Sequence, residues 1–366
     1  MSDRRTAKPR VLVLYTELAP YFLAGVRRLV HEHGACVHIV HWPVNREAPF
    51  ALGRTEGITL VERVRHDDRE LLRTCVGWSP DIVLCSGWVD KGYLKVCREM
   101  HRRGVPTVMC SDTAWRGSWR QWVALFAVQT WLRRTFSHAW VTGGPQARYA
   151  HYLGFDRKRI RTGFYAADVD VFAPLAQLLD GPKRDHFPHR LLCVARYIPT
   201  KGQQLLCDVF AGLCDAGHAR DWDLWLVGTG ELHDQVMGST SGSHPRIRHV
   251  GFVQADRMPE VMAQCGVFVL PSTYEPWGVV VQEHAVAGFP LVLSDAVGAA
   301  ERFLAEPFNG HRFIAGDPTS LAEALSRILN ASDDALIAMA RHSVELGRAW
   351  GPGDWARTVV ELITGP

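Results

Sequence analysis

The sequence predicts an α/β protein built from two doubly wound parallel sheets. Short apolar runs alternate with segments of helical periodicity, which is the pattern of parallel strands joined by helices. The alternation restarts near Leu191, after a stretch without periodicity at 169–189. The length of 366 residues and an apolar content of 47% suffice for two cores. We therefore expect a first domain at 1–168, a linker at 169–189 and a second domain at 190–349.

The first half begins with a buried strand and a helix that Gly34 ends. The expected strands are 11–15, 36–41, 81–85, 107–110 and 138–142, and the expected helices are 22–33, 91–102 and 122–136. In a parallel sheet, ligands bind beyond the carboxyl ends of the strands. The residues expected there are Thr16, Glu17, Ser86, Gly87, Ser111, Asp112 and Gly143.

The second half opens with a strand that ends near Arg196, a loop with Lys201 and Gly202, and a helix. Two cations at a strand end and a helix start can neutralise a diphosphate. Further strands are expected at 224–227, 267–270 and 291–294, and a terminal helix at 350–363. The first of these strands runs into a Gly-Thr-Gly turn at Gly228, which alone is a poor signal for nucleotide binding.

The stretch VLPSTYEPWGVVVQEHAVAGFPLVLS, residues 269–294, is the most informative part of the chain. It predicts a strand, a turn, a short helix at 279–287 and a second strand. Glu275 precedes the helix and Glu283 lies within it. The start of a helix presents unpaired N–H groups that bind phosphate. Carboxylates beside an anion site suit a ligand with both hydroxyls and phosphate, such as a sugar nucleotide, although two solvated glutamates would give the same spacing.

These motifs together resemble the donor-site signature of GT-B glycosyltransferases of the GT4 family. The resemblance covers 190–330 strongly and the first half in outline. It implies two Rossmann-like domains facing a cleft, with the terminal helix 350–366 packed back on the first domain. The implied ligands of the donor are Glu283 for the ribose, Glu275 for the sugar, Arg196 and Lys201 for the diphosphate, the backbone at Phe252 and Val253 for the base, and Pro276, Trp277, Gly278 and Gly228 around the phosphates.

Two departures from the family pattern concern the first half. Family members usually carry a Gly-Gly loop after the first strand, where this chain has Leu23-Ala24-Gly25, so Gly25 is the candidate for the phosphate contact. Many members place a histidine at the end of the strand that here finishes at Ser111 and Asp112. Asp112 could replace that histidine in contacting the sugar hydroxyls, or the acceptor is activated differently.

The charge is distributed unevenly along the chain. Residues 1–168 carry 26 Lys and Arg against 15 Asp and Glu, a net charge of +11, whereas the remainder carries 15 against 23, a net charge of −8. A basic half favours an anionic partner. No nucleic-acid motif accompanies the charge, so we expect an anionic membrane surface or a phosphate-bearing acceptor, with an evenly solvated surface as the alternative.

Segment 113–134 interleaves aromatic and basic residues, including Trp115, Arg116, Trp119 and Trp122, ahead of an apolar helix. It could lie in a membrane interface or form an acceptor groove, and a core helix filled by tryptophan is an equal alternative. No window reaches the ~18 apolar residues of a membrane span. The nine Cys form no C-x-x-C pair. A cytoplasmic protein, peripheral on the inner face of a membrane, is therefore expected.

The function implied is a retaining glycosyltransferase that moves a sugar from a nucleotide-diphosphate sugar to an acceptor hydroxyl, in the synthesis of a polysaccharide, a lipid-linked glycan or another glycoconjugate. No divalent metal or other cofactor is expected, because Arg196 and Lys201 can neutralise the diphosphate. The alternatives are a sugar-nucleotide epimerase of the same fold, a natural-product glycosyltransferase with a small-molecule acceptor, and a binding protein without turnover. A dehydrogenase is disfavoured, because no G-x-G-x-x-G follows either first strand.

Overall fold

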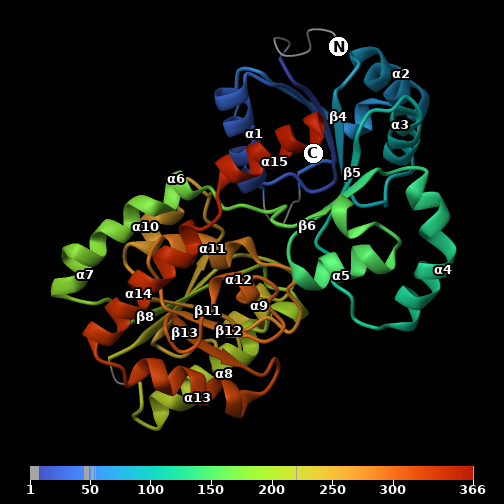
Figure 1. The fold of residues 1–366 in the computed structure, drawn as a ribbon. Helices are drawn as coiled ribbons and strands as arrows, with labels where there is room; N and C mark the ends of the chain where they lie inside the picture. The colour runs from blue at the N-terminus through green and yellow to red at the C-terminus, as the bar shows by residue number, and fades with distance from the viewer. Residues whose placement is uncertain (1–7, 45–48, 51–52, 54, 220, 366) are drawn as a thin grey trace. The chain divides into compact units, whose positions relative to one another are not determined.

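A computed structural model describes residues 8–44, 49–50, 53, 55–219 and 221–365. They form two compact units (Figure 1). The first comprises the described parts of 1–45, 51–166 and 350–366, and the second comprises those of 46–50 and 167–349. The chain thus crosses from the first unit to the second after Ala166, and returns after Ala349.

The first unit contains a seven-stranded parallel sheet with the order β3-β2-β1-β4-β5-β6-β7. Its strands are β1 (Arg10–Tyr15), β2 (Cys36–His41), β3 (Ile58–Glu62), β4 (Ile82–Ser86), β5 (Thr107–Ser111), β6 (His138–Val141) and β7 (Ile160–Arg161). Its helices are α1 (Pro20–His33), α2 (Asp68–Trp78), α3 (Lys91–Arg102), α4 (Trp119–Arg133), α5 (Gly144–Tyr152) and α15 (Pro352–Thr364). The central strand β1 pairs with β2 and β4, so that Val11 lies opposite Val37 and Ile82.

Helices cover both faces of the first sheet. Successive strand residues point to opposite sides, so each strand contributes residues to two cores. Val11 packs in a core with Phe22 of α1 and Trp355 of α15, whereas Leu12 packs in a second core with Tyr93 of α3. Helices α1 and α15 therefore cover one face and lie side by side in Figure 1. The rings of Trp355 and Phe22 meet edge to face at 5.3 Å.

The second unit contains a six-stranded parallel sheet with the order β10-β9-β8-β11-β12-β13. Its strands are β8 (Arg190–Val194), β9 (Asp223–Val227), β10 (Ile247–Gly251), β11 (Val267–Leu270), β12 (Leu291–Ser294) and β13 (Gly310–Phe313). Its helices include α8 (Gln203–Asp215), α9 (His233–Met237), α10 (Met258–Met262), α11 (Val279–Val286), α12 (Ala300–Phe303), α13 (Pro318–Leu329) and α14 (Asp333–Arg348). In β8, Leu192 lies opposite Trp225 of β9 and Phe268 of β11.

The stretch expected as a linker forms three short helical segments within the second unit, α6 (Val169–Phe172), η3 (Ala173–Asp180) and α7 (Pro182–Asp185). Each is too short to show a helical repeat, which explains the missing periodicity. Lys183 anchors the last of them, because its buried Nζ donates to the Cys265 carbonyl at 2.8 Å and lies 4.3 Å from the Phe289 ring centre. Burial lowers the pKa of Lys183 to about 8.

The predicted fold class is confirmed, since both sheets are parallel and wound in the Rossmann order. Four of the strands and helices named above for the first unit were not expected, namely β3, α2, α5 and β7. None of the five residues of β3 is fully buried, so this edge strand produces no apolar run. Within the described part of the chain, no helix combines the length and apolar character that a membrane span needs.

Candidate functional site

The candidate site of the second unit lies where its strand order reverses. Strand β8 is paired with β9 on one side and with β11 on the other. Their following helices leave in different directions at such a point, so a crevice forms beyond the strand ends. The loop from β8 to α8 carries Arg196 and Lys201, and the loop from β11 to α11 carries Glu275. The predicted residues therefore share one edge of one sheet.

These two loops are packed backbone against backbone. Gly202 has a φ of +72°, and a Cβ added there would lie 2.3 Å from the Pro271 carbonyl oxygen. Thr273 donates its N–H to the Thr200 carbonyl at 2.8 Å. Any side chain at 202 would force the loops apart, so this glycine is required by close approach as well as by its conformation.

The Gly-Thr-Gly turn after β9 is held against the same β8 loop. Gly228 has a φ of +137°, and a Cβ there would lie 2.1 Å from the Ala195 carbonyl oxygen. Tyr197 donates its N–H to the Thr229 carbonyl at 2.8 Å, and the Gly228 N–H donates to the Gly251 carbonyl at 2.8 Å. The turn, the β8 loop and the end of β10 are thus one hydrogen-bonded layer, so Gly228 fixes the surface on which a donor would lie.

The segment from Glu275 to Gly278 is pinned to the chain after β12. The backbone carbonyl of Glu275 accepts from the Gly298 N–H at 3.0 Å, and that of Trp277 accepts from the Ala299 N–H at 2.8 Å. The Trp277 side chain is 2% exposed and packs near Phe303, which leaves its backbone as the part available to a ligand. Gly278 is the N-cap of α11, whose first N–H groups point toward this loop.

Glu275 and Lys201 form an ion pair at the centre of the site. The Lys201 Nζ lies 2.5 Å from Glu275 Oε2, and the two side chains are only 14% and 13% exposed. The sequence predicted separate partners for them, the diphosphate for Lys201 and the sugar for Glu275. Each side chain neutralises the charge of the other. An incoming phosphate would compete with Glu275 for Lys201, so donor binding and the position of Glu275 are linked.

Glu283 lies in the second turn of α11 and is partly buried. Burial raises its pKa from 4.5 to about 7, and the nearby Asp168 carboxylate adds to this effect. Asp168 was not among the predicted site residues. Its proximity to Glu283 carries no local sequence signal, because the two residues are far apart in the chain. A ribose offering hydroxyl donors to Glu283 would favour its ionised form.

Phe252 and Val253 follow β10 directly and are partly buried, beside the turn at Gly228. The ring of Phe252 lies 5.5 Å from that of Phe50, and Gln254 Nε2 donates to the Pro49 carbonyl at 3.0 Å. Phe50 was not among the predicted residues. The predicted contact of this backbone with the base stays a prediction.

In the first unit, Asp112 stands beyond the carboxyl end of β5. The Tyr165 hydroxyl donates to Asp112 Oδ2 at 3.4 Å, and the Tyr165 ring meets Tyr21 edge to face at 5.3 Å. Burial raises the pKa of Tyr165 well above its usual value, so this hydroxyl remains a donor at neutral pH. Asp112 is therefore a hydrogen-bonded carboxylate beside aromatic rings, a combination that can bind a polyhydroxylated acceptor.

The expectation for Gly25 is corrected by the structure. Gly25 lies inside α1, where helical hydrogen bonding occupies the backbone, and not in a loop. A Cβ at this position would lie 2.7 Å from the Trp355 ring. The absence of a side chain is explained by the close packing of α15 on α1. Gly25 is thus a packing residue, and the loop contact with phosphate that the family pattern suggested has no counterpart at this residue.

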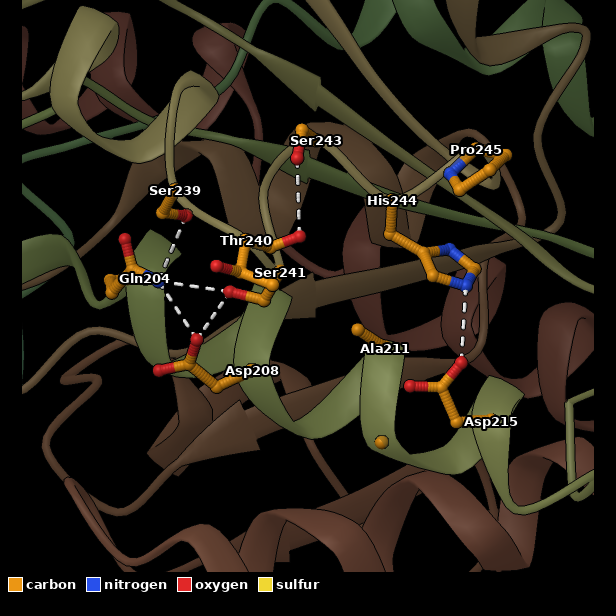
Figure 2. A pocket seen from close by; sticks show the side chains of 11 residues that line it. Gln204, Asp208, Ala211, Asp215, Ser239, Thr240, Ser241, Ser243, His244 and Pro245 are labelled. Carbon is orange, nitrogen blue, oxygen red and sulfur yellow. Dashed lines mark hydrogen bonds and ion pairs between the residues drawn. The ribbon is translucent and has the colours of Figure 1, made fainter.

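A separate groove of about 680 Å³ runs along α8 (Figure 2). Its polar groups are largely bound to one another: Asp208 accepts from Gln204 and from Ser241, and His244 lies 3.8 Å from Asp215. None of the predicted donor residues lines it. Among the residues that the structure describes, no group of three or more His, Cys, Asp or Glu side chains could hold a metal ion.

Comparison with known proteins agrees with this geometry. Residues 188–331 match the family model described as "Glycosyl transferases group 1". The chain is 31% identical over 179 residues to the phosphatidyl-myo-inositol mannosyltransferase of Mycobacterium leprae, which is 48% of this chain and 45% of that protein. It is 29% identical over 140 residues to the glycogen synthase of Mycobacterium tuberculosis, 38% of this chain and 31% of that protein. The chain thus matches less than half the length of these relatives.

Solved structures extend the likeness to both units. HepE from Anabaena, solved with UDP and glucose, has a TM-score of 0.71 at 15% identity and covers 97% of this chain and 99% of its own. Sucrose-phosphate synthase from Thermosynechococcus elongatus has a TM-score of 0.73 at 16% identity over 98% of both chains.

The protein is therefore a GT-B protein by fold, with a second unit that matches a glycosyltransferase family in sequence. In sequence, the likeness to a glycosyltransferase family covers residues 188–331, in the part of the chain whose motifs predicted it.

Proposed function

We propose that this protein is a retaining glycosyltransferase of the GT4 type, which transfers a sugar from a nucleotide-diphosphate sugar to an acceptor hydroxyl. The observation that carries the proposal is the edge of the second sheet at β8 and β11. There Lys201 and Glu275 form an ion pair ahead of the start of α11, and the loops that carry them and Arg196 are packed so closely that a Cβ at Gly202 or Gly228 would meet backbone. A site of fixed cations and N–H groups stabilises charge that develops on a departing diphosphate.

Relatives supply support for the donor class. HepE is described in complexes with UDP, with UDP and glucose, and with UDP-glucose, and the trehalose-6-phosphate protein of E. coli with UDP-2-fluoro glucose. The latter has a TM-score of 0.72 at 13% identity over 98% of this chain. We transfer only the class of ligand, a nucleotide-diphosphate sugar, because the sugar and the base depend on side chains that such distant relatives do not share.

Each site residue then has a stated task. Arg196 and Lys201 hold the diphosphate, and Glu283 accepts from the ribose hydroxyls. Glu275 faces the sugar, where its negative charge opposes the positive charge that grows at the anomeric carbon. The bond from that carbon to the phosphate oxygen breaks while the acceptor oxygen bonds on the same face, and the acceptor proton leaves with the nucleoside diphosphate. No carboxylate pair of the kind that retaining hydrolases use is needed.

The acceptor side of the reaction belongs to the first unit. Its net charge of +11 over 1–168 favours an acceptor that carries phosphate or lies in an anionic membrane. In α4, Trp119, Trp122 and Val123 are 72%, 51% and 57% exposed, whereas Leu132 is buried. This helix therefore has an unburied aromatic end suited to a membrane interface, where each surface cation contributes about 1 kcal/mol.

The transferase proposal is tested with UDP-, GDP- and ADP-sugars, first alone and then with a mixed lipid and glycan extract as acceptor. We expect slow hydrolysis alone and a glycosylated product, with retained anomeric configuration by NMR, when acceptor is present. A change of the sugar in the nucleotide without acceptor would show an epimerase instead. Tight binding without any turnover in the extract would show a binding protein.

The membrane proposal is tested by vesicle sedimentation at low salt. We expect preferential binding to vesicles with anionic lipid over neutral ones, weakened by salt and by the Trp119→Ala, Trp122→Ala double variant. Equal binding to both vesicle types would contradict it. A small soluble acceptor would then be the better assignment, as for natural-product glycosyltransferases.

A further inference from the structure

Helix α11 carries a buried polar side chain, Gln282, next to Glu283 in sequence. Gln282 is 1% exposed. Its Oε1 accepts from the Ala167 N–H at 2.8 Å, and its Nε2 donates to the Gly347 carbonyl at 3.0 Å. A buried amide must find such partners, because an unpaired polar group in a core is costly. The partners that Gln282 has, however, are two backbone groups 180 residues apart in the chain.

Both partners lie at the places where the chain changes units. Ala167 is the first residue of the second unit after the first crossing, and Gly347 lies two residues before the second crossing at Ala349. Gly347 also belongs to the last turn of α14, which packs on α11. A Cβ at 347 would lie 2.6 Å from the Val286 nitrogen of α11. Helix α11 is thus hydrogen-bonded to both segments that connect the units, at Ala167 and at Gly347.

The first connecting segment, at Ala167 and Asp168, also influences the charge around Glu283. Asp168 directly follows Ala167 and interacts with Glu283. Helix α6 begins at Val169 and packs on α11. The Ala167 N–H bond to Gln282 therefore fixes the backbone from which Asp168 reaches Glu283. A shift of this segment would change the charge environment of the residue proposed to bind ribose.

We propose that Gln282 is a positioning residue of the donor site, which couples occupancy of Glu283 to the two segments that connect the units. The inference rests on the proposed donor role of Glu283. A donor that orders α11 then stabilises the segments at Ala167 and Gly347 through one side chain. Coupling of this kind is reciprocal, so fixing these segments strengthens donor binding by the same factor.

The plain alternative is a core amide that stabilises the fold and nothing more. Asn309 offers a matched control in the same unit. It is 0% exposed, donates from Nδ2 to the Phe303 carbonyl at 2.8 Å and to Ser343 Oγ at 3.0 Å, and accepts from the Ala305 N–H at 2.7 Å. Asn309 makes three hydrogen bonds, one of them to Ser343 of α14, but it does not hold a connecting segment.

The test compares Gln282→Met with Asn309→Leu, two nearly isosteric replacements that remove a buried amide. UDP and GDP are the probes, with affinity measured by calorimetry at a temperature where every variant is folded. We expect both variants to lose thermal stability. Only Gln282→Met should bind nucleotide about tenfold more weakly, within the range that coupling through buried contacts reaches. In kinetics its loss should appear in the donor KM, with kcat nearly unchanged.

Hydrogen exchange adds a readout that a purely structural role would not move. In the wild type, nucleotide should slow exchange in peptides containing Ala167 and Gly347. The slowing should persist in Asn309→Leu and vanish in Gln282→Met. Gly347→Ala keeps Gln282 intact and acts on the same connection from its other end, so it should weaken nucleotide binding as well. It serves as the test variant if Gln282→Met does not fold.

The outcomes distinguish a failure of the proposed donor function from a failure of the proposed coupling. If the wild type binds neither nucleotide, the proposed donor function itself fails. If the wild type binds but Gln282→Met and Gly347→Ala bind as tightly as Asn309→Leu, the function stands and the coupling is refuted. A double-mutant cycle of Gln282→Met with Glu283→Gln should show non-additive losses in nucleotide affinity, and strict additivity would equally overturn the coupling.

Discussion

The two sheets of this protein share one strand order but end in edges of different character. At the ends of β1 and β4 in the first unit, the Thr16 N–H donates to Ser86 Oγ at 2.9 Å, and Arg63 and Asp90 form an ion pair between the loops that follow β3 and β4. Gly87, which follows β4, has no atom within 4 Å of a Cβ built on it. Beyond β8 and β11 in the second unit, the charged pair Lys201 and Glu275 is enclosed by loops in backbone contact.

The strand order thus determines where a ligand crevice forms, whereas the packing of the loops determines which groups are held there. In the proposed function, the first unit receives the acceptor, and the second unit holds the paired charges of Lys201 and Glu275 in loops that are in backbone contact. Charges held in place before the reaction are the condition for electrostatic catalysis without reorganisation. The following experiments test the difference between the two sheet edges, and the largest expected effect comes first.

Glu275→Gln should lower kcat about 100-fold or more, the usual loss when one preorganised electrostatic group is removed. The reason is that its charge acts on the anomeric carbon chiefly in the transition state. Donor affinity should change less, since Lys201 becomes available to the phosphate when its partner is neutralised. Steady-state kinetics with a separate calorimetric measurement of donor affinity distinguishes the two effects.

The matched variant is Glu283→Gln, which should raise the donor KM and leave kcat close to the wild-type value. The ribose that Glu283 contacts does not change during the reaction, so its interaction is equal in ground and transition states. The division of roles would be wrong if Glu283→Gln lost kcat while Glu275→Gln raised only KM.

Gly228→Ala tests the tightness of the second edge, with Gly87→Ala as its control in the first unit. Both glycines have positive φ, 137° and 64°, so each alanine carries backbone strain of roughly 1–3 kcal/mol. Only at 228 does the new Cβ meet backbone, at 2.1 Å from the Ala195 oxygen. We expect Gly228→Ala to weaken donor binding at least tenfold and Gly87→Ala to spare it. Equal donor affinities in the two variants would break the contrast.

Glu283 predicts a pH dependence of stability in the absence of donor. Its pKa is raised from 4.5 to about 7 in the folded protein. The folded state therefore binds this proton more tightly than the unfolded state does. Its stabilising contribution is complete below pH 4.5 and is lost as the pH rises through 7.

Glu283→Gln removes that loss, so it should be more stable than the wild type at pH 8 by about 1–2 kcal/mol, a value reduced for the partial exposure of the side chain. The difference should shrink as the pH falls toward 5. Thermal unfolding of both proteins across this pH range measures it. A constant difference at all pH values would show that Glu283 does not titrate there.

The smallest effect expected is that of EDTA, which should leave turnover unchanged. Arg196 and Lys201 supply the positive charge that a divalent ion provides in metal-dependent transferases. The measurement is the transfer rate before and after chelation, followed by addition of magnesium. Loss of turnover that magnesium restores would contradict the assignment of charge neutralisation to these side chains.

The sequence predicted the fold and the positions of most strands, because fully buried parallel strands are continuous apolar runs. Cys36–His41 and Lys91–Arg102 were predicted at their observed bounds. Edge strand β3 lacks such a run and was missed. Helix α2 was missed too, although Asp67 gives a usable signal, since its side chain accepts from the N–H groups of Arg69 and Glu70 as an N-cap.

Within the candidate site, sequence motifs could place residues on the correct loops but not against one another. The pairing of Lys201 with Glu275 joins residues 74 positions apart, and no local pattern encodes it. The same holds for Asp168 beside Glu283 and for Gln282 between the connecting segments. Gly25 is the opposite case. The family motif suggested a ligand contact at this position, but the glycine is explained by the close approach of the Trp355 ring.

Helix α15 has a consequence for how the protein is made. Trp355 lies in the core of the first unit, against Phe22 and Trp140, yet it is translated after the whole second unit. While the ribosome is still adding residues 167–349, the first unit lacks this ring and leaves α1 uncovered around Gly25. The second unit has its strands complete before then. The core of the first unit is therefore completed only after the second unit has been synthesised, and α1 lacks its cover from α15 until then.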